Sequence, residues 1–230
     1  MIALSFSQMR NIFLAKKNIA VVSNTSEPEK HSIDVYECVI RFHRGVLHLI
    51  PELWSKVDIL VLNGWYADEM FLYYDFLKHY PDVMIFFSRP KSSSLKNRFS
   101  ALLNAITQRK YFIPFRSIMW FWQRIFGVIP INQVHPIYLK DPFSSLQNKC
   151  FFVEQDLFYE IYQKTWIRNP TSWFVILYFL FTISHPSITP FNFKLDIQKN
   201  MYYWDNPTLH SPINHQTKDE FFALKKLWFF

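Results

Sequence analysis

Short apolar runs separated by polar turns and helical patterns dominate the first ninety residues of the chain. Four of these runs predict buried strands, at residues 19–22, 38–42, 57–62 and 83–87. A helical spacing of apolar side chains through residues 70–77 separates the last two runs. Continuous apolar strands that alternate with helices are typical of a parallel sheet with both faces covered. The pattern therefore predicts an α/β fold with a Rossmann-like, mostly parallel sheet flanked by helices.

The second half of the chain predicts helices at residues 156–166 and 173–183, a short strand at 187–189, and a last helix from about residue 218. The 173–183 run is the longest apolar stretch, about half of the ~20 residues that a membrane-spanning helix needs, so we expect a core helix. The length of 230 residues suits one large α/β domain. We expect a single domain over residues 1–230, with a basic aromatic segment at 89–130.

The net charge of +7 is concentrated in one part of the chain. No acidic residue occurs between Asp82 and Asp141, a stretch that holds nine basic residues, whereas the remainder holds 16 basic and 18 acidic residues. Lys and Arg beside Trp and Phe suit an anionic membrane surface, and we expect peripheral contact there. A solvated helix whose aromatic side chains fill the core is the alternative. Nucleic acid is the rival partner, but no nucleic-acid-binding motif is recognisable.

Cysteine usage and the start of the chain bear on the cellular compartment. Cys38 and Cys150 form neither a CxxC motif nor a disulfide framework, which favours a reducing compartment. In residues 1–17 the charges follow the apolar patch instead of preceding it, so no signal peptide is predicted. We expect a cytoplasmic location, either free or peripheral on the inner membrane.

The first candidate site segment follows the first predicted strand. Asn24 and Thr25 lie in a polar turn directly after residues 19–22. In a parallel sheet, ligands bind beyond the carboxyl ends of the strands. The Asn24 amide suits a nucleotide ribose or phosphate, and an ordinary turn between strand and helix is the alternative.

The second candidate segment precedes the apolar helix. Thr171 and Ser172 stand at its start, where a helix offers free N–H groups and a partial positive charge. Hydroxyl groups at this position suit a phosphate or a carboxylate. The alternative is ordinary capping of a core helix, which Ser and Thr commonly provide.

The third candidate segment leads into the last helix. His215 precedes Glu220 with four residues between them, and a histidine with a pKa near 6.5 suits a general base. The alternative is that Thr217 and Glu220 form a capping box and serve the helix start alone. Tyr202 and Tyr203 stand upstream in the same segment and suit a leaving phosphate, although loop tyrosines more often pack.

These three segments, in this order, resemble the motifs of the sialyltransferases of glycosyltransferase family 29. The long motif is similar to Ser23-Asn24, Ile33-Asp34 and Val39-Ile40-Arg41-Phe42. The small motif is similar to Pro170-Thr171-Ser172 with Phe191, and the last motifs are similar to Tyr202-Tyr203 and to His215 with Glu220. The resemblance covers about a third of the chain.

The resemblance implies a GT-A-like, metal-independent, inverting glycosyltransferase that uses CMP-sialic acid and no cofactor. It implies that His215 and Glu220 are the catalytic residues, with His215 deprotonating the acceptor hydroxyl. The donor-binding residues that it implies are Asn24, Thr25, Arg41, Thr171, Ser172, Tyr202 and Tyr203. The sequence contains no Asp-x-Asp, the carboxylate motif with which a metal-dependent transferase usually holds its cation, so no metal site is expected.

The chain departs from the family pattern where glycine is expected. Ser23, Trp173 and Pro190 replace three motif glycines, and His43 replaces an asparagine. Glycine at such positions lets the backbone approach a ligand closely, and an indole is a large group at the mouth of a phosphate-binding helix.

The expected acceptor is a surface glycan, lipooligosaccharide or capsule. The alternatives are transfer of another CMP-linked acidic sugar such as Kdo, a non-catalytic membrane-associated binding protein of the same fold, and a basic nucleic-acid-binding protein.

Overall fold

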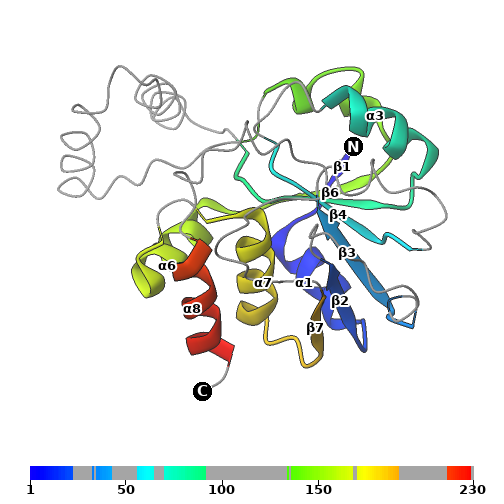
Figure 1. The fold of residues 1–230 in the computed structure, drawn as a ribbon. Coiled ribbons are helices and arrows are strands. Elements are labelled where there is room, and N and C mark those ends of the chain that lie inside the picture. The colour runs from blue at the N-terminus through cyan, green and yellow to red at the C-terminus, as the bar shows by residue number, and fades with distance from the viewer. Residues whose placement is uncertain are drawn as a thin grey trace, which may run out of the picture.

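The computed structural model describes residues 1–22, 33, 35–42, 56–64, 70–91, 134, 136–167, 170–191 and 217–228. The described strands form one seven-stranded sheet in the order β1-β6-β5-β4-β3-β2-β7, and every neighbouring pair is parallel (Figure 1). This arrangement confirms the predicted α/β, Rossmann-like fold.

Strands and helices alternate along the described chain. The strands are β1 (Ile2–Ala3), β2 (Ile19–Val22), β3 (Cys38–Phe42), β4 (Ile59–Leu62), β5 (Met84–Phe87), β6 (Lys149–Phe152) and β7 (Ile188–Phe191). The helices are α1 (Phe6–Leu14), α3 (Met70–His79), α6 (Gln155–Thr165), α7 (Ser172–Thr182) and α8 (Thr217–Trp228), with 3₁₀ turns η3 (Pro136–Leu139) and η4 (Phe143–Ser145).

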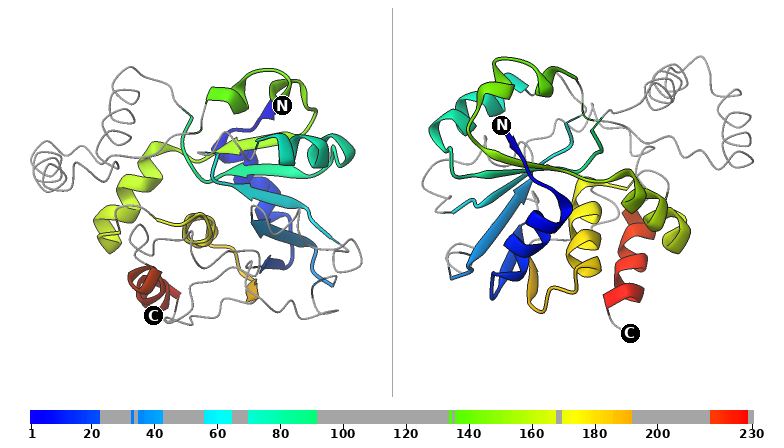
Figure 2. Two further views of the ribbon diagram at one scale, coloured as in Figure 1. Left: turned by 45° about the horizontal axis from the view of Figure 1, so that its top comes forward. Right: turned by 180° about the vertical axis from the view of Figure 1, so that it is seen from behind.

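Helices cover both faces of the sheet, as Figures 1 and 2 show. On one face, α7 lies between α1 and α8, and it shares one apolar core with α1, α6, α8 and the sheet. Seven consecutive residues of α7, from Phe174 to Leu180, are buried, as expected of a helix that is apolar on every side. On the other face, α3, η3 and η4 pack on β4 and β5 in a second core.

The path of the chain creates a switch point between β5 and β6. From β2 to β6 the chain steps across the sheet in one direction, and α3, η3 and η4 cover one face along the way. The connections from β1 to β2 and from β6 to β7 step the other way, with α1 and α7 on the opposite face. Because the chain leaves β5 and β6 toward opposite faces, this edge of the sheet is where open α/β folds commonly bind ligands.

Most predicted elements lie within two residues of the observed ones, but three were missed. Strands β1 and β6 and helix α1 had no counterpart in the prediction. Strand β1 has two residues, and β6 is a four-residue run that begins with an exposed lysine, so both carry a weak hydrophobic signal. Helix α1 starts with a full capping box between Ser5 and Gln8.

Several sequence expectations bear on regions that the structure describes only in part. Of the basic aromatic segment, residues 89–91 are described, so its predicted membrane contact lies largely outside the described residues. Within the described residues, no helix is long and apolar enough to cross a membrane.

Cys38 and Cys150 are buried free thiols, and burial is the main cause that raises their pKa values to about 12 and about 11.

Candidate functional site

Five buried polar side chains gather where β5 ends, α7 begins and α8 begins. They are Ser88, Arg89, Thr171, Ser172 and Glu220, each at most 8% exposed. We call this group the polar cluster. Burying polar groups is unfavourable unless they are hydrogen-bonded, so the partners of each member decide what the cluster does.

Ser88 joins α7 to the carboxyl ends of β4 and β5. Its backbone N–H donates to the carbonyl of Leu62 at 2.9 Å, which continues the pairing of the two strands by one residue. Its hydroxyl lies 2.7 Å from the hydroxyl of Ser172 and 3.3 Å from the Leu62 carbonyl. The first residue of α7 is therefore held directly at the centre of the sheet's carboxyl edge.

Arg89 ties the same edge to the segment before α7 and to α6. Its Nη2 donates to the carbonyl of Pro170 at 3.0 Å, and its guanidinium carbon lies 5.5 Å from the ring centroid of Phe158 in α6. Cation–π contact of this kind stabilises a guanidinium that has lost its water. With 2% of its surface exposed, Arg89 places a positive charge inside the cluster.

Glu220 binds Thr171 through both carboxylate oxygens. Oε1 accepts from the Thr171 backbone N–H at 2.7 Å, and Oε2 accepts from the Thr171 hydroxyl at 2.6 Å. The same hydroxyl accepts from the N–H of Phe174 at 3.3 Å, so Thr171 caps α7 while Glu220 holds the cap. The carboxylate thus lies at the positive end of the α7 dipole and joins two segments 49 residues apart.

Burial governs the protonation of Glu220. Loss of solvent raises its pKa from 4.5 to about 7, although the hydrogen bonds from Thr171 and the charge of Arg89 act in the opposite direction. The folded protein therefore holds a proton on Glu220 at a higher pH than an exposed carboxyl group would. The 2.6 Å contact with the Thr171 hydroxyl remains possible in both states, because either oxygen can carry the shared proton.

The structure brings together three of the predicted site residues, Thr171, Ser172 and Glu220. The predicted residues Asn24, Thr25, Tyr202, Tyr203 and His215 lie outside the described residues. Both hydroxyls at the start of α7 already have protein partners, since Thr171 binds Glu220 and Ser172 binds Ser88. The carboxylate of Glu220, proposed above as part of a capping box with Thr217, is directed at Thr171.

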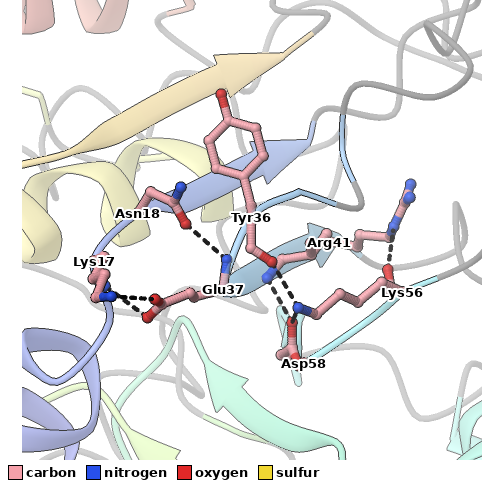
Figure 3. A network of polar contacts seen from close by, with 8 residues as sticks. Lys17, Asn18, Tyr36, Glu37, Arg41, Lys56 and Asp58 are labelled. Carbon is pink, nitrogen blue, oxygen red and sulfur yellow. Dashed lines mark hydrogen bonds and ion pairs between the residues drawn. The ribbon is translucent and has the colours of Figure 1, made fainter.

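Arg41, the fourth described residue of the predicted site, belongs to a different set of contacts. It is 3% exposed within β3, and its Nε donates to the carbonyl of Lys56 at 3.1 Å. Figure 3 shows this contact beside the polar side chains that join the segments preceding β3 and β4. In that network Asp58 accepts from the N–H of Val39 at 2.7 Å, and Lys56 donates to the carbonyl of Tyr36 at 2.6 Å.

Asn63 is a candidate residue that the sequence interpretation missed. It directly follows β4, beside Ser88 at the carboxyl edge of the sheet. Its Oδ1 is buried and accepts no hydrogen bond, which is costly for a carbonyl oxygen and suits a ligand that brings its own donor. The signal for it was an Asn-Gly pair straight after an apolar strand.

Gly64 fixes the turn that carries Asn63. Its φ of +68° lies in the left-handed region, which favours glycine. A Cβ there would lie 2.9 Å from the Phe87 ring and 3.1 Å from Val134, so no larger residue fits without displacement of the core. The chain has three glycines, and this one holds a polar side chain at the end of a central strand.

Trp173, expected to obstruct the start of α7, is partly buried and packs against the apolar core. Its ring centroid lies 6.0 Å from that of Phe174 in an edge-to-face arrangement.

Among the described residues, no group of three His, Cys, Asp or Glu side chains is arranged to hold a metal ion.

No protein-family model and no curated protein matches the chain. The sialyltransferase resemblance therefore stays a prediction from the motif residues of the sequence.

Proposed function

We propose that this chain is a sialyltransferase-type glycosyltransferase that transfers sialic acid from CMP-sialic acid to a surface glycan with inversion. The contact between Thr171 and Glu220 carries the proposal. The resemblance assigns these residues to two separate motifs of one active site, and two hydrogen bonds of 2.7 and 2.6 Å join them. The proposal requires these two segments to meet at one site, and the contact meets that requirement.

In this proposal the donor nucleotide binds at the carboxyl ends of β4 and β5. The start of α7 attracts its phosphate through the helix dipole, while Glu220 and Ser88 hold Thr171 and Ser172 in position. Asn63 accepts a hydrogen bond from a ribose hydroxyl or from the cytosine amino group through its unpaired Oδ1. Asn24 and Thr25, which follow β2 in the sequence, contribute from the second strand beyond β4, and Tyr202 or Tyr203 steadies the departing phosphate.

The raised pKa of Glu220 suits an anionic ligand. A fully charged buried carboxylate at the start of α7 would repel a phosphate. Because burial raises the pKa of Glu220 to about 7, the group takes up a proton readily when a second negative charge approaches. Glu220 then acts as a positioning residue, which holds Thr171 in either protonation state.

For the chemical step, His215 takes the proton of the acceptor hydroxyl. The acceptor oxygen attacks the anomeric carbon of the donor sugar, the bond from that carbon to the phosphate oxygen breaks, and CMP leaves with the electron pair. His215 stands two residues before α8, whose first turn is anchored on Thr171 through Glu220. The anchor therefore links the segment that carries the base to the helix that holds the donor.

The test is release of CMP from CMP-sialic acid in the presence of a panel of oligosaccharides, with calorimetric CMP binding measured alongside. His215→Ala is expected to abolish turnover and to retain CMP binding. The matched control is His79→Ala on the exposed end of α3, which is expected to leave both unchanged. Turnover with CMP-Kdo alone would favour the Kdo alternative, and CMP binding without turnover of either donor would favour the non-catalytic binding protein. Absence of CMP binding would contradict the whole proposal.

A further inference from the structure

Trp166 has an unfavourable backbone conformation for a large residue. It ends α6 with φ of +62° and ψ of +10°, in the left-handed region. Helices commonly end in this conformation, but the residue there is usually glycine, because a side chain is strained by the left-handed backbone. A bulky residue at positive φ is an outlier, and such strain gathers at functional sites.

The indole of Trp166 does not pack in the core, so core packing does not offset the backbone strain. The residue is 64% exposed, whereas the following residue, Ile167, is 1% exposed. Single apolar residues on a surface need no special reason, but this one combines exposure with a strained backbone. The left-handed turn therefore has the effect of presenting an aromatic ring to solvent.

The exposed ring is held in a defined orientation. Its centroid lies 5.7 Å from that of Tyr162, one turn earlier in α6, at an interplanar angle of 69°. The backbone N–H of Trp166 donates to the Tyr162 carbonyl at 2.8 Å, and the Thr165 hydroxyl donates to the Ile161 carbonyl at 2.6 Å. An aromatic ring oriented in advance loses little conformational entropy when a ligand covers it.

The position of Trp166 relates it to the proposed donor site. Pro170 follows Trp166 by four positions in the chain, so their Cα atoms lie at most about 14 Å apart. The carbonyl of Pro170 binds Arg89 in the polar cluster, and the next residue is Thr171. A short segment therefore connects Trp166 to the residues that hold the start of α7, and the proposal places the acceptor sugar between them.

We propose that Trp166 is a stacking platform for a sugar ring of the acceptor glycan. The apolar C–H face of a pyranose packs on the indole, while its hydroxyl groups remain in water. This inference rests on the proposed function and adds an acceptor subsite to it. The platform binds the acceptor and takes no part in bond breaking, so it affects acceptor affinity and leaves donor affinity alone.

The test exchanges Trp166 for glycine, the residue that the backbone favours. Trp166→Gly is expected to unfold at the same temperature as the wild type or a higher one, because the left-handed strain is relieved. The KM for the best oligosaccharide of the panel is expected to rise about three- to tenfold, the range typical of a lost aromatic contact. The CMP dissociation constant and kcat are expected to stay unchanged, and Trp166→Phe is expected to recover part of the KM.

Ser184→Gly is the matched control, because Ser184 also has a positive φ, of 57°, just after α7. It is expected to relieve strain without any change in acceptor KM. An unchanged KM in Trp166→Gly, with CMP binding and turnover intact, would overturn the platform and leave the proposed function standing. Loss of binding to phosphatidylglycerol vesicles in Trp166→Gly, with acceptor KM unchanged, would overturn it in favour of a membrane contact. Absence of CMP binding in the wild type would instead contradict the proposed function.

Discussion

The carboxylate of Glu220 accepts both the backbone N–H and the hydroxyl of Thr171, at 2.7 and 2.6 Å. These two residues stand at the starts of different helices, and neither is more than 7% exposed. With the Ser172–Ser88 contact, the pair fixes the start of α7 to α8 on one side and to the end of β5 on the other. The segments that the resemblance assigns to separate motifs are thus parts of one hydrogen-bonded unit.

Removing the Glu220 carboxylate should destabilise this unit. In Glu220→Ala the buried N–H of Thr171 loses its acceptor, and a buried donor left unpaired costs about 1–3 kcal/mol. We expect the free energy of unfolding in urea to fall by that amount. Lys164→Ala, which removes an exposed ion pair with Glu160, is the control and should change it by less than about 0.5 kcal/mol. Equal effects of the two substitutions would show that the Glu220 contacts do not stabilise the fold.

Stability should decrease as pH rises from about 4.5 to about 7. The folded pKa of Glu220 is raised, so in this window the folded state keeps a proton that the unfolded state has lost. The 2.5-unit interval corresponds to about 3 kcal/mol at most, lost by pH 7 and constant above it. Urea unfolding at several pH values measures it, with Glu220→Gln as the comparison. If the difference between wild type and Glu220→Gln is the same at pH 5 and pH 8, Glu220 has no raised pKa.

Asn63→Ala should weaken CMP binding without weakening the fold. The substitution removes a buried carbonyl oxygen that has no donor, so we expect stability to remain the same or to rise slightly. A hydrogen bond to the nucleotide is worth about 0.5–1.5 kcal/mol, which corresponds to a rise of about two- to tenfold in the CMP dissociation constant by calorimetry. An unchanged dissociation constant would remove Asn63 from the site.

Gly64→Ala should weaken both the fold and CMP binding. The positive φ strains any side chain, and the new Cβ would approach the Phe87 ring to 2.9 Å. We expect a loss of about 1–3 kcal/mol in the free energy of unfolding, typical of overpacking in a core. CMP affinity should fall as well, because the turn carries Asn63. A variant as stable as the wild type would show that this turn can shift, and that Asn63 is not held in place by it.

The sequence predicts an element of this fold well when the element's own residues form a clear apolar pattern, and poorly when the element depends on pairing with a distant segment. Strands β2 to β5 and helix α7 are buried almost completely, so their apolar runs predicted them directly. Strand β6 has three apolar residues after an exposed lysine, and its place beside β5 depends on pairing that no local pattern records.

In the candidate site, too, local patterns predicted some residues, whereas their contacts depend on the fold. Thr171 and Ser172 were predicted because hydroxyls before an apolar helix form a local pattern. The partners of these hydroxyls, Glu220 and Ser88, stand 49 and 84 residues away, and only the fold brings them together. Arg41 was predicted from a motif, but its Nε contact with Lys56 depends on the segment that precedes β4.

The most direct test of the central claim is a crystal structure of the chain with CMP. We expect the nucleotide to lie over the carboxyl ends of β4 and β5, with its phosphate at the start of α7 and with Asn63 Oδ1 accepting one of its hydrogen bonds. A nucleotide bound elsewhere, or a start of α7 that the side chain of Trp173 closes to the phosphate, would contradict the account.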